Sequence, residues 1–521
     1  MKNNLFKKIF FIFVIFLIGL AIYVMYKDGK KESITIQNSE IEINMVKEFN
    51  IGIIEYDTIN PILSNNRDVQ YIDKLIFDSL LEISYDFNIS NSLAKEFSKI
   101  NSVTYLIKLK EDVFWHDGTK FSSRDVIFTI ENLINNDIQS IYKENVKNIE
   151  QIVEIDDYTI KIVLKEETPF FEYMMCFPIL ASHAYDKNFN SITNFPVGTG
   201  KYKILNIQDD KIEIGKSDMQ NKSKIDNINI LMKDSMKELY NAFSSKEVDF
   251  IITNNTMYEE YIGTMGYNVT YSSGRELEYL VFNNKNSLLV NKNVRKAINH
   301  AIDKTLINYH VYNNKYLRCN FPLEYGSYLY NSQEKLYEYN LNESKNLLIQ
   351  DGWTYNNGNW RKGNKILEFN LVVDESNQNR VECANQIKEQ LDDFGIKINI
   401  VKVNDNIYNN YIKNKKFDII LTGNNVSNNP DLETYFGENN LSNFENEEIR
   451  NILNEVKNIS NKDTLKEKYF RIEKIYAEEL PFICLHFNKL SVLTNSNLKG
   501  DLSHNWYNLF YNIDSWYKVK E

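Results

Sequence analysis

Residues 111–134 read EDVFWHDGTKFSSRDVIFTIENLI, a stretch that predicts the end of a strand, a tight turn and the start of a helix. Residues 104–110 before it alternate polar and apolar side chains, which is typical of a half-buried strand. The His-Asp-Gly run at 116–118 predicts the turn, because glycine tolerates a positive φ angle. Ser122 and Asp125 have the spacing of a helix capping box. Apolar residues then recur at helical spacing, at Val126, Ile130, Leu133 and Ile134.

The composition is that of a large folded protein. The chain has 521 residues, 43% of them hydrophobic and 25% charged, which is enough for several domains and a sizeable core. Its 60 basic and 71 acidic residues give a net charge of −11, which argues against a nucleic-acid-binding protein. No two cysteines form a CxxC pair, so we expect free buried thiols rather than a zinc ribbon or redox site. The cysteines are Cys176, Cys319, Cys383 and Cys484.

The N-terminus carries an apolar segment. Residues 9–26 hold no charged side chain, which just meets the length that spans a bilayer core. Lys2, Lys7 and Lys8 precede it, so we expect this end to stay cytoplasmic and the rest of the chain to be exported. A cleaved signal sequence is the alternative, although the one small-x-small site, at 19–21, lies inside the apolar run. We expect a transmembrane anchor or signal sequence over residues 1–30, then a polar tether over 31–45.

Further short motifs follow one another along the chain. They are Ile-Asn-Pro at 59–61, Ser-Leu-Ala-Lys-Glu-Phe at 92–97, Trp-His-Asp-Gly at 115–118, Pro-Val-Gly-Thr-Gly-Lys-Tyr at 196–202, and Val-Arg-Lys-Ala-Ile at 294–298 with Ala-Ile-Asp-Lys at 301–304. In type, order and spacing this series resembles the family 5 extracellular solute-binding proteins, the peptide- and nickel-binding components of ABC importers. The resemblance runs from Asn60 to Asp303 and continues less sharply to the C-terminus.

The second half of the chain predicts an α/β lobe. Residues 367–373 and 396–403 have strand patterns, and 379–394 between them has a helical one, which together make a βαβ unit with a parallel crossover. Residues 417–421 predict a further buried parallel strand. With the resemblance, this implies a periplasmic-binding-protein-like α/β fold of type II, in which two lobes are joined by a hinge and lobe 1 carries an extra subdomain.

The implied division of the chain follows from this reading. We expect lobe 1 over residues 46–273, with an inserted subdomain at about 85–190. Lobe 2, the α/β ligand-binding lobe, covers 274–480, and residues 481–521 return to lobe 1.

The Gly-Thr-Gly-Lys run at 198–201 has a nucleotide-binding alternative. A phosphate-binding loop needs GxxxxGK followed by Ser or Thr. Here Tyr202 follows the lysine and no glycine stands five residues before Gly200. We therefore predict a tight turn between strands and no nucleotide.

Signals for catalysis are weak. The sequence has neither a GxSxG elbow nor an HExxH motif, and its six histidines are scattered singly. The His116-Asp117 pair could belong to a metal-dependent phosphohydrolase, but no second His/Asp cluster supports that reading. We predict that the protein is not an enzyme and has no cofactor or metal site.

Candidate ligand contacts follow from the expected strand ends, because open α/β sheets bind ligands beyond the carboxyl ends of their strands. The candidates are Glu55, Tyr56, Asp57, Tyr279, Asn283, Gly423, Asn424, Asn425, Asp431 and His486.

The resemblance also bears on the ligand. Peptide-binding members carry a Gly-Trp segment and then an Asp four residues before a Pro, and that Asp pairs with the α-amine of the peptide. This chain aligns there by Gly423 and Pro430, but Asn424 stands at the Trp position and Val426 at the Asp position. The amine-binding carboxylate is missing unless Asp431 or Glu55 replaces it, which favours a blocked, cyclic or non-peptide ligand.

The resemblance implies the substrate-binding protein of an ABC importer, anchored in the cell membrane with its globular part extracellular. It would capture a peptide or other small solute as a monomer and work with ABC permease and ATPase subunits. A peptide-pheromone or signal receptor and a nickel-chelate binder on the same fold remain alternatives. So do an exported enzyme and a paralogue that has lost its ligand.

Overall fold

The computed structural model describes residues 45–135, 138–217, 221–332, 338–459 and 461–520. The predicted membrane anchor and almost all of the predicted tether lie outside these residues. Within the described ranges, no helix has both the length and the apolar character needed to cross a membrane.

One mixed sheet of 11 strands runs through the molecule, in the order β19-β18-β20-β13-β21-β12-β2-β11-β10-β9 with β14 beside β21. Its strands are β2 (Glu48–Ile53), β9 (Tyr202–Ile207), β10 (Lys211–Lys216), β11 (Asn227–Met232), β12 (Phe250–Thr253), β13 (Tyr267–Phe282), β14 (Leu317–Arg318), β18 (Glu368–Asp374), β19 (Lys397–Val403), β20 (Ile419–Asn425) and β21 (Phe482–Asn495).

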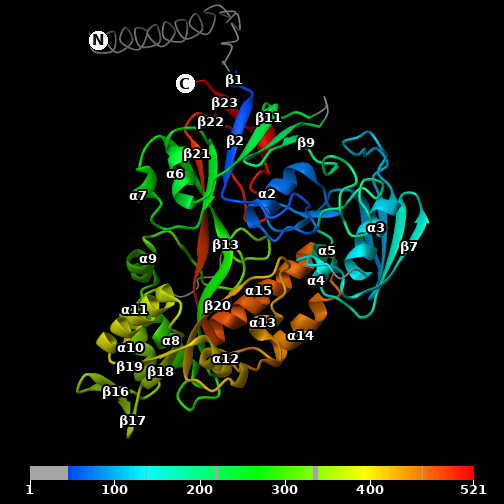
Figure 1. Cartoon of the computed structure of the whole chain (residues 1–521). Helices are drawn as coiled ribbons and strands as arrows, with labels where there is room; N and C mark the ends of the chain where they lie inside the picture. The colour runs from blue at the N-terminus through cyan, green and yellow to red at the C-terminus, as the bar shows by residue number, and fades with distance from the viewer. Residues whose placement is uncertain (1–44, 136–137, 218–220, 333–337, 460, 521) are drawn as a thin grey trace, which may run out of the picture.

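Figure 1 shows an upper and a lower part along this sheet. The upper part contains β2 and β9–β12 with α2 (Arg67–Ile76), α6 (Met236–Ser244) and α7 (Glu259–Ile262). The lower part contains β18–β20 with α8 (Lys292–Ala301), α9 (Lys304–Tyr312), α10 (Leu341–Gln350), α11 (Gln378–Phe394), α12 (Asp405–Asn414), α13 (Glu433–Phe436), α14 (Glu447–Val456) and α15 (Lys462–Glu479).

Two long antiparallel strands, β13 and β21, link the two parts. They pair from Tyr267 opposite Asn495 to Val281 opposite Phe482, and their register shifts between Ser273 and Leu277. The chain thus enters the lower part along β13 and returns along β21. The predicted boundary at 273/274 falls inside β13, at this irregularity.

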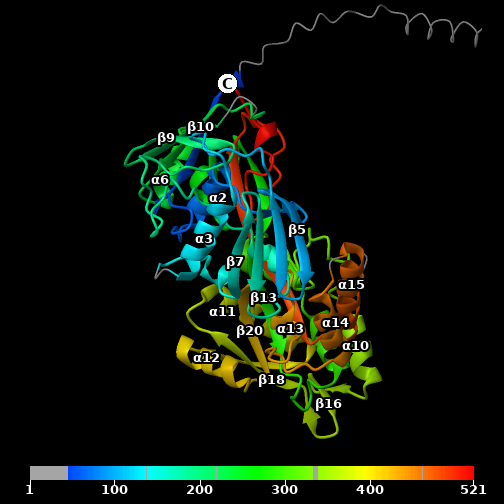
Figure 2. The same cartoon turned by 90° about the vertical axis from the view of Figure 1, so that its right-hand side faces the viewer.

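A four-stranded side sheet, β5-β6-β8-β7, stands beside the upper part (Figure 2). Its strands are β5 (Ala94–Asn101), β6 (Thr104–Leu109), β7 (Ile149–Asp156) and β8 (Thr159–Leu164), and its helices are α3 (Ser123–Asn135), α4 (Lys143–Val146) and α5 (Phe171–Met174). Smaller pieces are β3 (Leu81–Ile83) with β4 (Ile89–Asn91), β15 (Thr354–Asn356) with β16 (Asn359–Lys362) and β17 (Lys365–Ile366), β1 (Met45–Val46) with β22 (Leu498–Lys499) and β23 (Tyr517–Val519), and the 3-10 helix Ile513–Ser515.

The strand, turn and helix predicted around residues 111–134 are confirmed as β6, the 116–118 turn and α3. Gly118 has a φ of 87°, and the Asp125 carboxylate accepts the Ser122 N–H at 2.9 Å, as the capping box requires. The same carboxylate accepts the indole N–H of buried Trp115. Asp125 therefore ties the turn to the helix.

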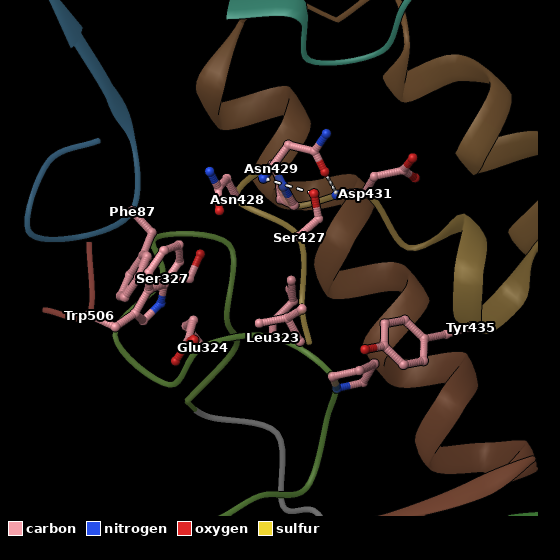
Figure 3. Close-up of a pocket in the computed structure, with 13 residues that line it drawn as sticks. Phe87, Leu323, Glu324, Ser327, Ser427, Asn428, Asn429, Asp431, Tyr435 and Trp506 are labelled. Carbon is pink, nitrogen blue, oxygen red and sulfur yellow. Dashed lines mark hydrogen bonds between the residues drawn. The ribbon is translucent and has the colours of Figure 1, made fainter. Parts of the chain in front are cut away.

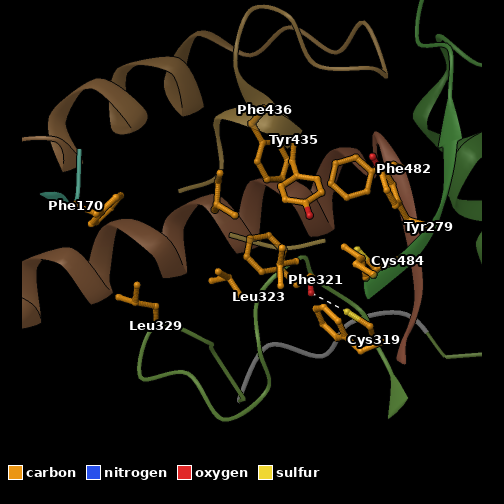
Figure 4. Packing of buried hydrophobic residues seen from close by; sticks show 14 of the residues in the cluster. Phe170, Tyr279, Cys319, Phe321, Leu323, Leu329, Tyr435, Phe436, Phe482 and Cys484 are labelled. Carbon is orange, nitrogen blue, oxygen red and sulfur yellow. Dashed lines mark hydrogen bonds between the residues drawn. The ribbon is translucent and has the colours of Figure 1, made fainter. Parts of the chain in front are cut away.

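The predicted βαβ unit is also confirmed. Strands β18 and β19 pair in parallel, with α11 between them in the chain, and β20 joins β18 in parallel. An aromatic cluster packs near the carboxyl end of α15 and includes Phe321, Tyr435, Phe436 and Phe482 (Figure 4). The four cysteines are buried and free, as expected from their spacing.

The prediction that residues 198–201 form a tight turn between strands was wrong, and so was the physical reason given for the glycines. Neither Gly198 nor Gly200 has a positive φ angle, and the segment precedes β9 instead of forming a strand-to-strand turn. A Cβ on Gly198 would lie 1.9 Å from the Ile76 carbonyl oxygen at the end of α2. Glycine is needed here because two backbones approach closely.

Candidate ligand-binding cleft

Two adjoining pockets lie between the upper and lower parts and share Phe87 and Leu323. We call them together the cleft. The first has about 470 Å³ of empty space including its open mouth, and its walls come from Phe87, residues 322–324, Ser327, residues 426–431, Tyr435 and Trp506 (Figure 3). The second, about 790 Å³ measured in the same way, adds aromatic side chains such as Tyr85, Tyr325 and Phe487.

The loop after β20 forms one wall of the first pocket and is held from two sides. The Val426 N–H donates to the Arg275 carbonyl at 2.8 Å, and the Arg275 guanidinium donates back to the Val426 carbonyl at 2.9 and 3.1 Å. The Tyr469 hydroxyl on α15 donates to the Pro430 carbonyl at 2.7 Å. The loop is thus fixed to β13 and to α15, which favours a preformed site.

Trp506 lies between guanidinium groups and the first pocket. The Arg275 guanidinium is 5.0 Å from the indole ring centre, which allows a cation–π interaction. The Arg67 side chain donates to the Trp506 carbonyl at 3.2 Å. Burial lowers the pKa of Arg275 and the nearby Arg67 charge lowers it further.

Glu324 is the most deeply buried carboxylate of the cleft, with 7% of its surface exposed. The Ser273 hydroxyl donates to its Oε2 atom, while its Oε1 atom has no hydrogen-bond partner among the described residues. Burial raises the pKa of Glu324 to about 7, although Ser273, Trp506 and Arg275 act in the opposite direction. A carboxyl group here is costly to ionise without a further partner.

Several buried polar atoms of the cleft lack partners in the part of the chain that the structure describes. They are Ser272 Oγ, Glu324 Oε1, Asn428 Oδ1, His504 Nδ1 and Trp506 Nε1. The Trp506 N–H nevertheless lies close enough to the Glu324 carboxyl to lower its pKa as a hydrogen-bond donor. Buried polar groups are hydrogen-bonded in the great majority of cases. These atoms therefore need a further partner, such as water or a solute.

Phe87 has a strained backbone at the point where the pockets meet. Its φ angle is 62°, which is unusual for a bulky residue, and its ring centre lies 5.9 Å from that of Trp506. The Ser84 carbonyl accepts the Phe87 N–H, and the Phe87 carbonyl accepts the Tyr173 hydroxyl. Strain that is held in this way concentrates at functional sites.

The predicted contact residues have different surroundings. Asp431 and Val426 both line the first pocket. Gly423, Asn424 and Asn425 end β20 opposite β13, where Asn424 donates to the Tyr435 hydroxyl at 3.0 Å. These residues lie in or next to the cleft, and their contact with a solute stays a prediction.

Glu55, Tyr56 and Asp57 lie in a loop of the upper part and line neither pocket of the cleft. The Asp57 carboxylate accepts the Ser64 hydroxyl at 2.7 Å and the backbone N–H groups of Thr58, Asn65 and Asn66. Burial raises the pKa of Asp57, but these hydrogen bonds outweigh it and the pKa is lowered. The structure therefore gives Asp57 a role in closing its own loop.

Tyr279, Asn283 and His486 face the interior of the lower part. Tyr279 is 7% exposed and packs edge-on against Tyr435 and Phe482. The Asn283 side chain donates to the Phe417 carbonyl at 2.9 Å. His486 lies against the ring of Tyr312, with centroids 4.4 Å apart. Tyr279 on β13 and His486 on β21 are buried at inward-facing strand positions, which strand ends alone did not reveal, whereas Asn283 follows β13 and is half-buried.

Sequence reasoning missed Phe87, Arg275, Glu324 and Trp506. Each lies outside the motifs, and their proximity depends on long-range contacts between β13, β21 and the loops around them. No group of three or more His, Cys, Asp or Glu residues fit to hold a metal ion is found within the described ranges.

Comparison with known proteins gives a consistent picture. A model of the family described as bacterial extracellular solute-binding proteins, family 5 Middle, matches residues 88–446, more than half of the chain. The oligopeptide-binding protein AppA of Bacillus subtilis (strain 168) is 22% identical over 537 residues, covering 97% of this chain and 98% of AppA. The nickel-binding protein NikA of Staphylococcus aureus (strain NCTC 8325 / PS 47) is 23% identical over 442 residues, covering 81% of this chain and 85% of NikA.

Solved structures show the same fold. The structure of Bacillus subtilis AppA in complex with a nonapeptide matches with a TM-score of 0.57 and 21% identity, over 91% of this chain and 99% of that one. A nickel ABC transporter structure from Bacillus halodurans matches with a TM-score of 0.79 and 20% identity, over 89% of this chain and 98% of that one. The periplasmic-binding-protein-like α/β fold is thereby confirmed.

Proposed function

The chain belongs to the bacterial extracellular solute-binding proteins of family 5, and from this premise we propose that it captures a peptide or peptide-like solute in the cleft and delivers it to the permease of an ABC importer. The observation that carries the proposal is the set of buried polar atoms around the cleft that have no hydrogen-bond partner in the described part of the chain. Glu324 and Asn428 belong to loops of the lower part, whereas His504 and Trp506 belong to the C-terminal return. A solute between them would satisfy groups of both parts at once.

Capture by lobe closure fits the connections of the chain. We place lobe 1 over residues 46–273 with a subdomain at about 85–190, lobe 2 over 274–480, and the return to lobe 1 over 481–521. The irregular pairing of β13 with β21 near Gly274 supports a hinge there. A Cβ on Gly274 would lie 2.1 Å from the Asn488 side chain, so the two strands are close at this position.

The cellular arrangement is part of the same proposal. Residues 9–26, preceded by lysines, would anchor the chain in the membrane with the globular part outside. The protein would act as a monomer without enzymatic activity and pass its solute to permease and ATPase subunits. The net charge of −11 supports a role without nucleic acid.

Thermal unfolding of the full chain in detergent, against di- to hexapeptides with free or acetylated N-termini, tests the function. A ligand at a free concentration of 100 times its Kd stabilises the folded state by roughly 2.7 kcal/mol. The variant Ser427→Trp would fill the first pocket and abolish the shift, whereas Thr354→Trp, on the exposed β15 hairpin, would leave it unchanged. Stabilisation by a nickel–histidine complex and by no peptide would contradict the proposal.

A further inference from the structure

The resemblance places Val426 where peptide-binding members of the family carry the acid that pairs with a peptide amine. Val426 stands there with 9% of its surface exposed, and Arg275 holds its carbonyl. Glu55, one suggested replacement, lines neither pocket of the cleft. The other, Asp431, accepts the Glu433 N–H at 3.0 Å, and Figure 3 shows its carboxyl group turned away from Phe87 and Trp506.

We propose that Glu324 is the counter-ion for a cationic N–H group of the solute, such as the ammonium of a peptide or of another amine. The inference rests on the proposed function, because it names the chemistry of a solute in the same cleft. Glu324 lies on the loop between β14 and α10 and lines the first pocket, as does Val426 at the Asp position of the family. Its carboxylate is more than nine-tenths buried, and its Oε1 atom is unpartnered among the described residues.

The hydrogen-bonding capacity of Glu324 leaves room for such a group. An ionised carboxylate offers about four lone-pair sites. Ser273 occupies one on Oε2, and the nearby Trp506 N–H, which has no hydrogen bond of its own in the described ranges, can occupy at most one more. Asn428 Oδ1 is a second unpartnered acceptor in the same pocket. Two acceptors call for a donor with several N–H bonds, which a primary ammonium has and a quaternary ammonium lacks.

The surroundings suit a cation that has left water. The rings of Phe87 and Trp506 line the pocket and can face a positive charge. The basic groups near Glu324 have other partners, since Arg275 donates to the Val426 carbonyl and Arg67 to the Trp506 carbonyl. His504 from the C-terminal return is kept neutral, because burial lowers its pKa to about 4. Arg275 therefore acts on Glu324 only as a nearby charge, and a direct N–H partner for the carboxylate is left for the solute to supply.

Binding by the full chain is measured calorimetrically for three kinds of probe. They are di- to hexapeptides with a free N-terminus, N-acetylated forms of those peptides that contain no lysine, and 1,4-diaminobutane. We expect free peptides or the diamine to bind and acetylated peptides to bind weakly. The substitution Glu324→Gln should weaken the binding of the cationic probes roughly 10- to 100-fold, as expected for the loss of a hydrogen-bonded charge. Glu368→Gln is the matched control, because it neutralises a carboxylate at the start of β18 that lines neither pocket of the cleft, and it should change these affinities little.

A structural role of Glu324 would lower thermal stability and affect every probe alike, whereas the proposed role affects only cations and is partly restored by Glu324→Asp. Equal binding of free and acetylated peptides, unchanged by Glu324→Gln, would overturn the inference and leave the proposed function intact. Binding of the diamine through Glu324, without any peptide, would support the inference and contradict the proposed function. If no probe binds, both are contradicted.

Discussion

Burial of Glu324 makes the free energy of unfolding depend on pH in a definite direction. Its pKa is raised from an ordinary 4.5 to about 7 in the folded protein. Between these values the folded state holds the proton that the unfolded state has released. The contribution of Glu324 to the stability of the ligand-free protein is therefore fully present below about pH 4.5 and is lost as the pH rises to about 7.

Glu324→Gln should remove that loss. At pH 7.5 we expect the variant to be more stable than the parent by up to ~3 kcal/mol, since each pKa unit corresponds to about 1.4 kcal/mol. At pH 4 the difference should vanish. Urea unfolding of both proteins across this range measures it, and a difference that does not change with pH would show that the buried carboxyl does not titrate as proposed.

His486 has the opposite pH dependence. Burial lowers its pKa from 6.5 to about 3, with the charges of Lys304 and Arg380 acting in the same direction. The unfolded state binds the proton first, so stability is present above about pH 6.5 and is lost as the pH falls towards 3. His486→Phe keeps an aromatic ring beside Tyr312 and should gain about 2 kcal/mol over the parent by pH 5. Urea unfolding at pH 7 is the control, where this gain should be absent.

Single residues were predictable where a local rule applies to them. The Ser122 and Asp125 cap and the Gly118 turn follow from spacing, because their partners lie within a few residues. Glu324 and Trp506 meet across 182 positions of chain that no local rule connects. For the same reason the sequence proposed Asp431 and Glu55 as acids for the solute, and did not propose Glu324.

At the scale of elements, the contact of the 198–200 segment with α2 supplies a test. The Gly200 N–H donates to the Ile76 carbonyl at 2.9 Å, and a Cβ on Gly198 would overlap that same oxygen. Because backbone atoms cannot move aside as a flexible side chain does, Gly198→Ala should destabilise the protein by more than about 2 kcal/mol. Gly326→Ala is the control, since a Cβ there would come no closer than 3.7 Å to the Phe87 ring. Equal midpoints in urea for the two variants would refute this reason for the glycine.

Elements with local patterns were predicted well, and elements defined by long-range pairing were not. The β18–α11–β19 unit is contiguous in the chain, so its alternating and helical patterns suffice. Strand β13 extends over residues on both sides of the expected boundary because β21, about 200 positions later, supplies its partner. The pairing that gives β13 its length is invisible in the pattern of β13 alone.

At the scale of the whole molecule, Lys315 joins the two parts on the side of the sheet where α7 and α9 lie. Its ammonium is 3.9 Å from the ring centre of Tyr258 and 3.2 Å from the Glu259 carboxylate, both in the upper part, while the residue itself lies between α9 and β14. On the side of the molecule where the four-stranded side sheet lies, the Lys99 ammonium of β5 donates a hydrogen bond to the Lys457 carbonyl just after α14. These contacts hold the cleft walls together. A ligand that closes the lobes would favour the same arrangement and add to their effect.

Lys315→Met should therefore shift the ligand-free protein towards more open conformations, because it removes the cation that contacts both Tyr258 and Glu259. Small-angle X-ray scattering should give a larger radius of gyration for the variant, and any ligand found for the cleft should bind more weakly, since part of its binding free energy must then close the lobes. Lys292→Met is the matched control, because the ion pair of Lys292 with Glu479, at 2.7 Å, lies within the lower part and should not affect closure. A saturating ligand should bring the radius of gyration of Lys315→Met back to that of the parent. If the two variants scatter and bind alike, Lys315 does not hold the lobes, and the closed arrangement rests on the pairing of β13 with β21.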